Sequence, residues 1–500
     1  QPDPVGAGGP PGLEGAMIRN RGRLALAAMA AWSLLLGGCA TPFSHAVSGP
    51  EADQVARFEQ QAEALRTRLF IPGMSAVILK DEQVLWAKGF GYADVEHRIP
   101  ATPETVYHIA SETKPVAATL VMQLVEQGKL DLDEPASHYT SEIKGDAIRI
   151  RHLLSHTAGS EPPGERFAYD PAHYEYLTNV IEKHAGKPMR LVVAETILDP
   201  LGMTSSVPGP DVLKDPRWAV LGQDRLARYA KVLERQAQPY TLYGNGEIVH
   251  VGYPIDFFGA SAGLLSTVMD MAKFDIALDR HVLLKPETQA RAWTPFVSNA
   301  GQPLPYGLGW YVRDYNGARI IWHGGNWGTG FSAIYVKVPA ERLSLIMFAN
   351  SDVLNGHMYA VGEDIVHNAF ACAFLRDFVF APTQDVDCAR TSETAVAKSL
   401  AEERAGAHPV VPVDRATVES YVGQYRFEFD PRQVLNVTSH DGRLYADIPA
   451  NQETELFPES PNTFFFKIRP AEITFVKDGD AVTHLDWVEY GRTLRANRIR

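Results

Sequence analysis

Segments typical of β-strands lie on both sides of a long helix-rich stretch, and this order constrains the fold more than any other feature of the chain. Two apolar segments, 74–79 and 84–90, flank a short polar stretch and predict a hairpin. Helical patterns then dominate 111–203 and return at 267–278. Four further strands are expected at residues 307–313, 318–323, 331–338 and 343–350. These segments predict a mixed α and β domain.

Local signals support several of these elements. Thr267, followed three positions later by Asp270, predicts the start of a helix. Asn316 and Gly317 supply the turn between two expected strands. An amphipathic helix should precede the first hairpin, because apolar residues recur there at three- and four-residue spacing: Val55, Phe58, Ala62, Leu65 and Leu69.

The pattern changes near the C-terminus to short strands separated by turn residues. We expect a domain over 53–385, a linker over 386–411 rich in Ala and Glu, and a second domain over 412–500. The second domain should be a small antiparallel barrel or sandwich, because its strand-like segments are short and evenly spaced. Those segments are 434–439, 444–448, 463–468, 473–477 and 482–488.

The N-terminal region reads as a targeting segment. Residues 1–16 are rich in Gly and Pro and are interpreted as a non-structural leader. Arginines and a short apolar run in 17–38 predict a secretory signal. The run ends in Leu-Gly-Gly-Cys, which resembles the lipobox of bacterial lipoproteins, so Cys39 is expected to carry lipid and 39–52 to be a tether. The protein would then be anchored on the periplasmic side of a membrane, the outer membrane being favoured; an ordinary signal peptide is the alternative.

Composition excludes several classes of protein. Hydrophobic residues make up 45% of the 500 residues, enough for a large core. A net charge of −13 without a basic block argues against a nucleic-acid partner. No Cys or His spacing typical of a metal site occurs. Of the three cysteines, Cys372 and Cys388 form the possible disulfide once Cys39 is lipidated, with two buried thiols as the alternative.

The most informative motif is Ser111-Glu-Thr-Lys114, which precedes an apolar helical run. If Ser111 opens that helix, Lys114 lies one turn further along the same face. A helix N-terminus offers N–H groups to a developing oxyanion, and a lysine in a partly dry cleft can activate a seryl hydroxyl. Ser111 is therefore the candidate nucleophile. Alone the motif is weak, because Ser and Lys are common surface residues.

Further blocks follow in a consistent order. They are 151–159 (RHLLSHTAG), 163–169 (PGERFAY), 199–203 (DPLGM), 306–310 (YGLGW) and 322–325 (WHGG). Together with Ser-x-x-Lys, these blocks resemble the class C β-lactamase-related serine hydrolases, a family of β-lactamases, D-stereospecific peptidases and family VIII carboxylesterases. The resemblance covers about residues 55–385. It implies an α+β fold, in which an antiparallel sheet is flanked by helices and accompanied by a helical subdomain, and it implies no cofactor.

The resemblance also implies roles for single residues. Ser111 and Lys114 correspond to the nucleophile and its partner, and Tyr169 to the family's general base. A cationic Lys114 nearby would favour the phenolate of Tyr169. His323-Gly324-Gly325 stands where β-lactamases have Lys-Thr-Gly, at a strand end beside the cleft. The N–H groups of Ser111 and Asn326 would form the oxyanion hole.

Two departures from the family pattern favour ester substrates. Pro171 stands in place of the Asn in Tyr-x-Asn and cannot donate to a substrate amide. His323 replaces a fixed lysine cation that could hold a carboxylate. Both changes weaken recognition of lactams and acyl-D-peptides more than ester cleavage; Asp170 or Asn326 could compensate.

Other motifs support weaker interpretations. Ser261 lies in a Gly-x-Ser-x-Gly sequence, but the preceding residues make a poor buried strand, so we do not expect a nucleophile elbow. His152 and His156 lack the glutamate of a zinc motif and are expected to pack under the cleft. Glu112 is expected to be an exposed carboxylate at a helix start.

The C-terminal segment Tyr-Val-Gly-Gln-Tyr, residues 421–425, resembles the lipocalin-like domain appended to many of these hydrolases. Phe465 is expected to face away from its two aromatic neighbours and could serve an interface. The sequence as a whole predicts an esterase that works through an acyl-serine, with peptide or lactam hydrolysis as the alternative. A non-catalytic binding protein on the same fold is the alternative of another class. The oligomeric state is not predicted.

Overall fold

The computed structural model describes most of the chain from residue 49 onward. The described residues are 49, 51–242, 248–253, 257–327, 330–355, 364–380, 410–428, 434–448, 452–466, 471–479, 481–489 and 492–499. The expected leader, signal peptide and Cys39 lie outside them, as do Cys388 and nearly all of the expected linker. Within the described residues, no helix has both the length and the apolar character needed to cross a membrane.

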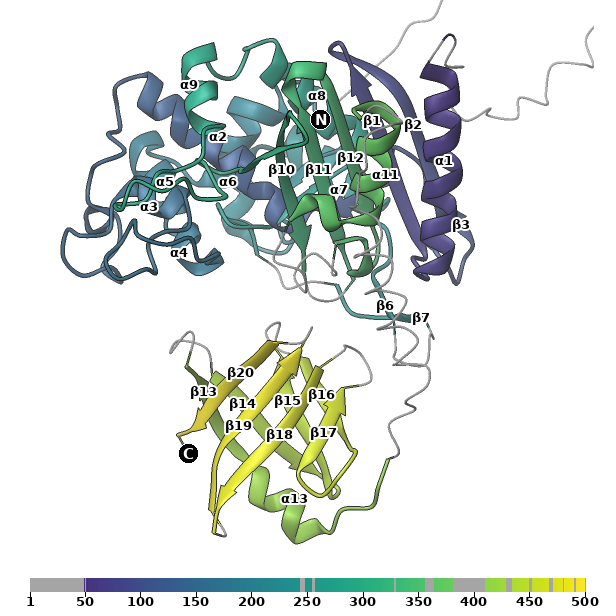
Figure 1. The fold of residues 1–500 in the computed structure, drawn as a ribbon, viewed down its shortest axis with the longest axis vertical. Coiled ribbons are helices and arrows are strands. Elements are labelled where there is room, and N and C mark those ends of the chain that lie inside the picture. The colour runs from purple at the N-terminus through teal and green to yellow at the C-terminus, as the bar shows by residue number, and fades with distance from the viewer. Residues whose placement is uncertain are drawn as a thin grey trace, which may run out of the picture. The chain divides into compact units, whose positions relative to one another are not determined.

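A seven-stranded antiparallel sheet forms the centre of the first domain (Figure 1). Its strand order is β3-β2-β1-β12-β11-β10-β9, so the N-terminal hairpin pairs with the strands that follow the helical region. The strands are β1 (Gly73–Lys80), β2 (Gln83–Asp94), β3 (Ile99–Pro100), β9 (Tyr311–Tyr315), β10 (Ala318–Asn326), β11 (Ser332–Val338) and β12 (Leu343–Ala349). The expected hairpin and mixed fold are confirmed. The strand expected at 307–313 begins four residues later, at Tyr311.

Both faces of the sheet are buried, and side chains alternate between two cores. In β1, Ala76 and Ile78 face helices α1 (Glu51–Arg68) and α11 (Ala369–Phe378), whereas Val77 and Leu79 face the opposite core. Apolar residues repeated every three or four positions place one stripe of α1 against α11. The opposite core contains α2 (Thr113–Glu126) and α8 (Val268–Asp279).

The helical region lies between β4 (Tyr107–His108) and β9, and it contains mostly short helices. Local signals set their ends: Thr267 Oγ1 accepts the Asp270 N–H (3.0 Å) at the start of α8, as expected, and Gly186 (φ 68°) ends α5. The helices are α3 (Ile150–Leu154), α4 (Pro171–Glu175), α5 (Leu177–Ala185), α6 (Met189–Val193), α7 (Gln223–Leu233) and α9 (Pro286–Ala292). The smaller sheets are β4 (Tyr107–His108) with β8 (Leu264–Ser266) and β5 (Val207–Pro208), and β6 (Tyr240–Leu242) with β7 (Ile248–His250).

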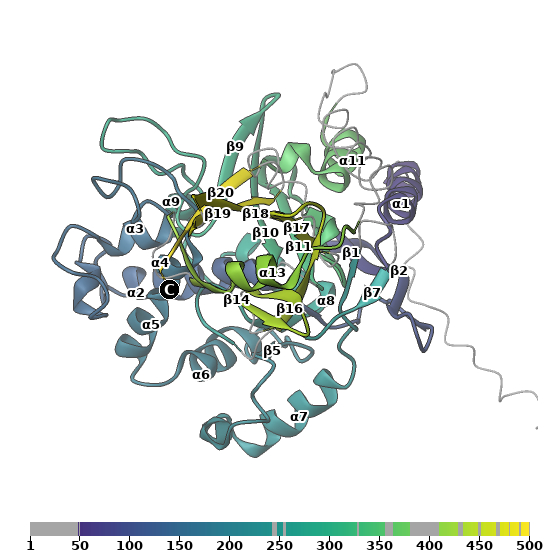
Figure 2. The ribbon, with the colours of Figure 1, turned by 90° about the horizontal axis from the view of Figure 1, so that it is seen from below.

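The second domain is a closed eight-stranded barrel, which confirms the expected small all-β domain. Figure 2 shows its strands as a ring with α13 (Arg415–Tyr421) across one end. Val418 and Tyr421 of α13 join the barrel core. Phe465 is largely buried and pairs with Phe457, its ring centroid 5.9 Å away. The strands are β13 (Gly423–Phe427), β14 (Val434–His440), β15 (Arg443–Ile448), β16 (Gln452–Pro458), β17 (Thr463–Phe466), β18 (Ala471–Asp478), β19 (Ala481–Glu489) and β20 (Arg492–Arg498).

Candidate active site

Ser111 lies in a tight turn at the start of α2. The turn is a 3-10 segment, η1 (Ala110–Glu112), and Ala110 has a φ of 48°, in the left-handed region that a residue with a Cβ rarely adopts. The Ala110 N–H donates to His108 Nδ1 (3.1 Å), and Thr113 Oγ1 donates to the Ala110 carbonyl (2.7 Å). These bonds hold the strained backbone beside the seryl oxygen, which is the usual location of such strain in enzymes.

Lys114 is fully buried one helical turn beyond Ser111, as the spacing predicts. Its Nζ donates to Ser111 Oγ (2.9 Å) and to the backbone carbonyl of Ser261 (2.7 Å). A buried cation is costly unless polar groups surround it. Because one of those groups is the seryl oxygen, the lysine is positioned to act on the serine.

Tyrosine rings cover the same ammonium group. Lys114 Nζ lies 5.0 Å from the ring centroid of Tyr169 and 5.5 Å from that of Tyr174. The Tyr174 hydroxyl also donates to the Lys114 carbonyl (3.1 Å). The structure therefore brings together the three residues that the sequence predicted for the site. Tyr169 lies 58 positions after Ser111 in the chain, yet its ring contacts Lys114.

Two buried histidines near this group are neutral. Burial, and then the charge of Lys114, lowers the pKa of His323 to about 3. His323 Nδ1 donates to the Gly324 carbonyl (2.7 Å), so Nε2 accepts from the Tyr306 hydroxyl (2.9 Å). Burial likewise lowers the pKa of His156, whose Nδ1 accepts the Asp170 N–H (3.0 Å). Both histidines thus support the backbone around the site and add no positive charge.

The end of β10 passes directly beside the serine turn. A Cβ at Gly325 would lie 2.2 Å from the Ile109 carbonyl oxygen, so only glycine fits at this position. The Asn326 side chain donates to the Asp352 carbonyl and to Asn355 Oδ1 (both 3.1 Å). Gly324, Gly325 and Asn326 therefore lie at a strand end beside Ser111. The expected oxyanion hole from the Ser111 and Asn326 N–H groups stays a prediction.

Ser261, the serine of the Gly-x-Ser-x-Gly sequence, has a different role in the site. Its Oγ donates to Glu175 Oε2 (2.6 Å), while its carbonyl oxygen accepts from Lys114. Residues 257–263 form no strand, so the nucleophile elbow lacks its preceding strand. Sequence reasoning missed the contact between Lys114 and the Ser261 carbonyl, because these two residues lie 147 positions apart.

Glu112 differs from its sequence prediction. Its side chain is completely buried, and neither carboxyl oxygen has a hydrogen-bond partner among the described residues. The prediction of an exposed carboxylate is wrong because η1 packs against β10 and β11 instead of facing solvent. Burial raises the pKa of Glu112 well above its ordinary value, so the group is protonated where a free carboxyl would ionise.

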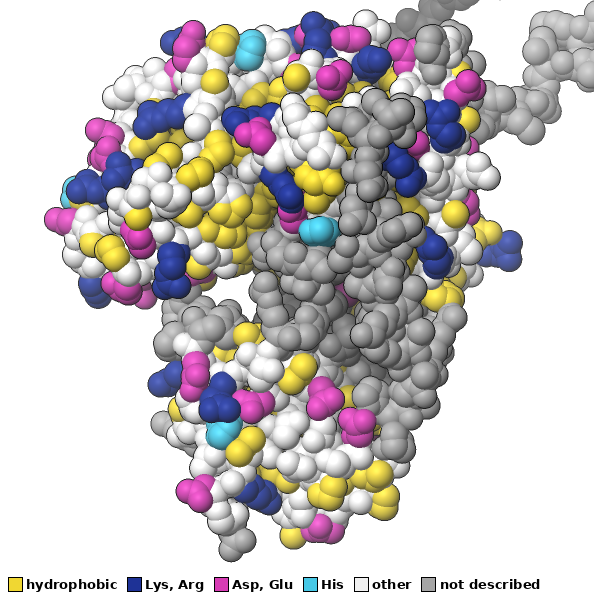
Figure 3. All heavy atoms as spheres, viewed as in Figure 1, with side chains coloured by type: hydrophobic (Ala, Val, Ile, Leu, Met, Phe, Trp, Pro, Cys, Tyr) yellow, Lys and Arg dark blue, Asp and Glu magenta, His cyan; other side chains and the backbone are white. Residues whose placement is uncertain are grey.

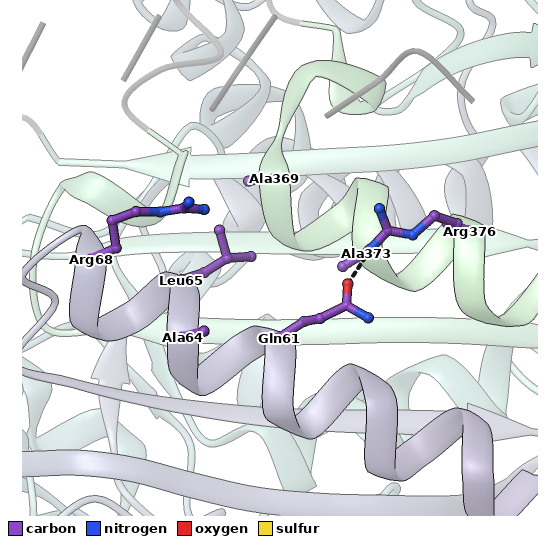
Figure 4. A pocket seen from close by; sticks show the side chains of 7 residues that line it. All are labelled: Gln61, Ala64, Leu65, Arg68, Ala369, Ala373 and Arg376. Carbon is purple, nitrogen blue, oxygen red and sulfur yellow. Dashed lines mark hydrogen bonds between the residues drawn. The ribbon is translucent and has the colours of Figure 1, made fainter. Parts of the chain in front are cut away.

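A separate pocket of about 290 Å³ lies between α1 and α11, the two helices on the sheet face opposite α2 (Figure 4). Its lining includes Leu65, Ala369 and Ala373, and Gln61 hydrogen bonds to Arg376 across it. None of the candidate site residues lines this pocket.

Metal-binding groups and cysteines of the described residues complete the description of the domain. They contain no group of three or more His, Cys, Asp or Glu side chains placed to hold a metal ion. Cys372 is buried in α11 and is disulfide-bonded. Cys388, its possible partner from the sequence, lies outside the described residues, so the pairing of these two cysteines is not tested.

A serine hydrogen-bonded to a buried lysine, at the start of a helix that packs against an antiparallel sheet, is the arrangement expected of a serine hydrolase. Residues 58–365 match the family model described as beta-lactamase. The match spans more than half of the chain, and the protein belongs to the beta-lactamase family.

Relatives and solved structures agree with this assignment. Penicillin-binding protein 4* of Bacillus subtilis is 23% identical over 454 residues, which cover 83% of this chain and 93% of the relative. A D-aminopeptidase of Gluconobacter oxydans is 25% identical and covers 59% of each chain. The octameric penicillin-binding protein homologue from Pyrococcus abyssi has the same fold, with a TM-score of 0.53 at 22% identity, over 89% of this chain and all of that one.

Proposed function

We propose that the protein hydrolyses carboxylic esters through an acyl-enzyme on Ser111. The observation that carries the proposal is the 2.9 Å hydrogen bond between Lys114 Nζ and Ser111 Oγ in a buried setting. A seryl oxygen held by a cation is stabilised as its proton leaves, which is the requirement for nucleophilic attack. Both neighbouring histidines are neutral, so they do not add positive charge beside this lysine.

The reaction has two steps. Ser111 Oγ bonds to the ester carbonyl carbon while its proton passes to the Tyr169–Lys114 pair. The carbon–oxygen bond of the ester then breaks, and that proton leaves with the alcohol. Water repeats the sequence on the acyl-serine, so that the products are a carboxylic acid and the original enzyme. Backbone N–H groups of Ser111 and Asn326 would hold the oxyanion in both steps.

Two features support esters over amides. Pro171 occupies the first turn of α4 and has no N–H or side-chain donor for a substrate amide. His323 is neutral and wholly enclosed by Tyr306 and neighbouring rings, so it offers no cation to a substrate carboxylate. An ester needs neither contact.

Hydrolysis of D-peptides is the second candidate, supported by the similarity to a D-aminopeptidase. A panel of p-nitrophenyl esters, D-amino acid p-nitroanilides and a chromogenic cephalosporin separates the candidates. We expect kcat/KM to be highest for the esters; a higher value for the anilides or the cephalosporin would reverse the ranking. Absence of any acyl adduct on Ser111 would instead support the binding-protein alternative.

The proposed place of action is the periplasmic side of a bacterial membrane, with lipid on Cys39. This part of the proposal is supported by the signal-like segment 17–38 and the residues that precede Cys39. Mass spectrometry of the protein from a membrane fraction would test it, with acylated Cys39 as the expected N-terminus and an unmodified cysteine as the contrary result.

A further inference from the structure

Glu175 is a carboxylate that the proposed reaction does not use, although it contacts the residue that holds Lys114. It lies at the end of α4, and its Oε2 accepts two hydrogen bonds from Ser261, one from N–H (3.0 Å) and one from Oγ (2.6 Å). Its Oε1 accepts from Thr178 Oγ1 (2.7 Å). Both oxygens of Glu175 are therefore held by hydrogen bonds, two from Ser261 and one from Thr178.

The same contacts fix the turn at residues 259–261. Thr178 Oγ1 accepts the Ala260 N–H (2.8 Å), so the amides of two successive turn residues bind side chains from α4 and α5. A Cβ at Gly259 would lie 1.8 Å from Glu175 Oε1, which shows how closely the carboxylate is packed on the turn. The turn cannot shift without breaking these bonds.

The carbonyl oxygen of Ser261 connects this turn to Lys114. It accepts from Lys114 Nζ at 2.7 Å, on the same nitrogen that bonds to Ser111 Oγ. A lysine side chain has four rotatable bonds and needs more than one contact to be held in one geometry. A movement of about 1 Å at a reacting group can cost about a hundredfold in rate.

We propose that Glu175 is a positioning residue, which holds the Ser261 turn so that its carbonyl keeps Lys114 on the Ser111 hydroxyl. This role rests on the proposed function. We assign this role to hydrogen-bond geometry, because the hydrogen bonds that connect Glu175 to Lys114 pass through Ser261. Burial raises the pKa of Glu175, although the charge of Lys114 acts on the carboxyl in the opposite direction, and the variants below separate the two effects.

Three variants of Glu175 separate geometry from charge. Glu175→Gln retains an oxygen that can accept both Ser261 hydrogen bonds but has no charge. Glu175→Asp retains the charge but is one methylene too short to reach. Glu175→Ala loses both. We expect the Asp and Ala variants to lower kcat for a p-nitrophenyl ester by about ten- to a hundredfold with little change in KM, and the Gln variant to stay within about threefold of the wild type.

Asp270 provides a matched control in the same domain. Its Oδ2 also accepts from a serine N–H, that of Ser205 (2.7 Å), and from a serine hydroxyl, that of Ser206 (2.9 Å), and it is buried. Asp270→Ala should lower the melting temperature with kcat unchanged. The Asp and Ala variants of Glu175 should instead lower kcat by more than any loss of folded protein explains.

The experiment measures the rate of Ser111 acylation by mass spectrometry beside kcat, KM and melting temperature for each variant. Equal acylation rates in wild type and Glu175→Ala would overturn the positioning role alone. So would an active Asp variant beside an inactive Gln variant, since charge would then be the cause. A wild-type protein that forms no acyl adduct would remove the proposed function, and this role with it.

Discussion

The ammonium of Lys114 lies 5.0 Å from the ring centroid of Tyr169 while it bonds to the oxygen of Ser111. One buried cation therefore lies beside both the nucleophile and the tyrosine whose phenolate would take the proton of the seryl hydroxyl. The neutral state of His156 and His323 leaves this cation as the positive charge of the site.

Removal of the Tyr169 hydroxyl should stop proton transfer without disturbing the packing. Tyr169→Phe keeps the ring that covers Lys114 and contacts His156, with centroids 4.3 Å apart. We expect kcat for a p-nitrophenyl ester to fall by about 10²–10⁴-fold. Tyr174→Phe is the control, because the Tyr174 hydroxyl bonds to a backbone carbonyl and should affect mainly stability. Equal losses in kcat for the two variants would contradict the role of Tyr169.

Replacement of Lys114 by an uncharged residue of similar length should separate activity from stability. Lys114 is fully buried, so Lys114→Met removes the cost of an enclosed charge but also the hydrogen bonds to Ser111 and the Ser261 carbonyl. Because these effects on stability oppose each other, we expect a melting temperature close to that of the wild type and a loss of activity of about 10³-fold or more. Steady-state kinetics and calorimetry measure the two effects. Retention of a tenth of the activity would exclude Lys114 from the reaction.

The sequence was informative where local spacing determines the result. Ser111 and Lys114 are one helical turn apart, so a short motif predicts their contact. Apolar patterns likewise predicted every strand of the central sheet except the two-residue β3. In the barrel, β13, β16 and β20 were not among the expected strands. The sequences of β16 and β20, QETELFP and RTLRANR, contain few apolar residues, and these strands gain their partners only when the barrel closes.

Contacts between segments that are distant along the chain could not be predicted from the sequence. Glu175 binds Ser261 across 86 positions, and no local pattern marks either residue as part of the lysine's surroundings. Glu112 was wrongly assigned to the surface because a carboxylate at a helix start is usually solvated. Its burial depends on β10 and β11, which come two hundred residues later in the chain.

An asparagine at position 171 should shift selectivity toward amides. Pro171 is exposed in the first turn of α4, where a backbone N–H has no partner within the helix, so Pro171→Asn should fold. One new hydrogen bond to a substrate amide is worth about 1 kcal/mol, or about fivefold in kcat/KM. We expect this gain for a p-nitroanilide but not for the p-nitrophenyl ester of the same acyl group. A similar gain in Pro171→Ala, which adds no donor, would show that the cause is not a hydrogen bond.

Glu112 should make the folded state less stable as pH rises. Burial raises the pKa of Glu112 in the folded protein, so its stability contribution is complete below the ordinary carboxyl pKa and is lost as pH rises toward the raised value. Glu112→Gln cannot ionise. The free energy of unfolding of this variant minus that of the wild type should therefore increase with pH, by at most about 1.4 kcal/mol per pH unit. Denaturant titrations at several pH values between 4 and 8 measure it; a constant difference would contradict the protonated state.

The most direct test of the account is intact-mass spectrometry of the protein after a brief reaction with a p-nitrophenyl ester, followed by peptide mapping. We predict one acyl group on Ser111, formed faster than it is released, and none on the Ser111→Ala variant. An acyl group on Ser261, or undiminished ester hydrolysis by Ser111→Ala, would contradict the central claim.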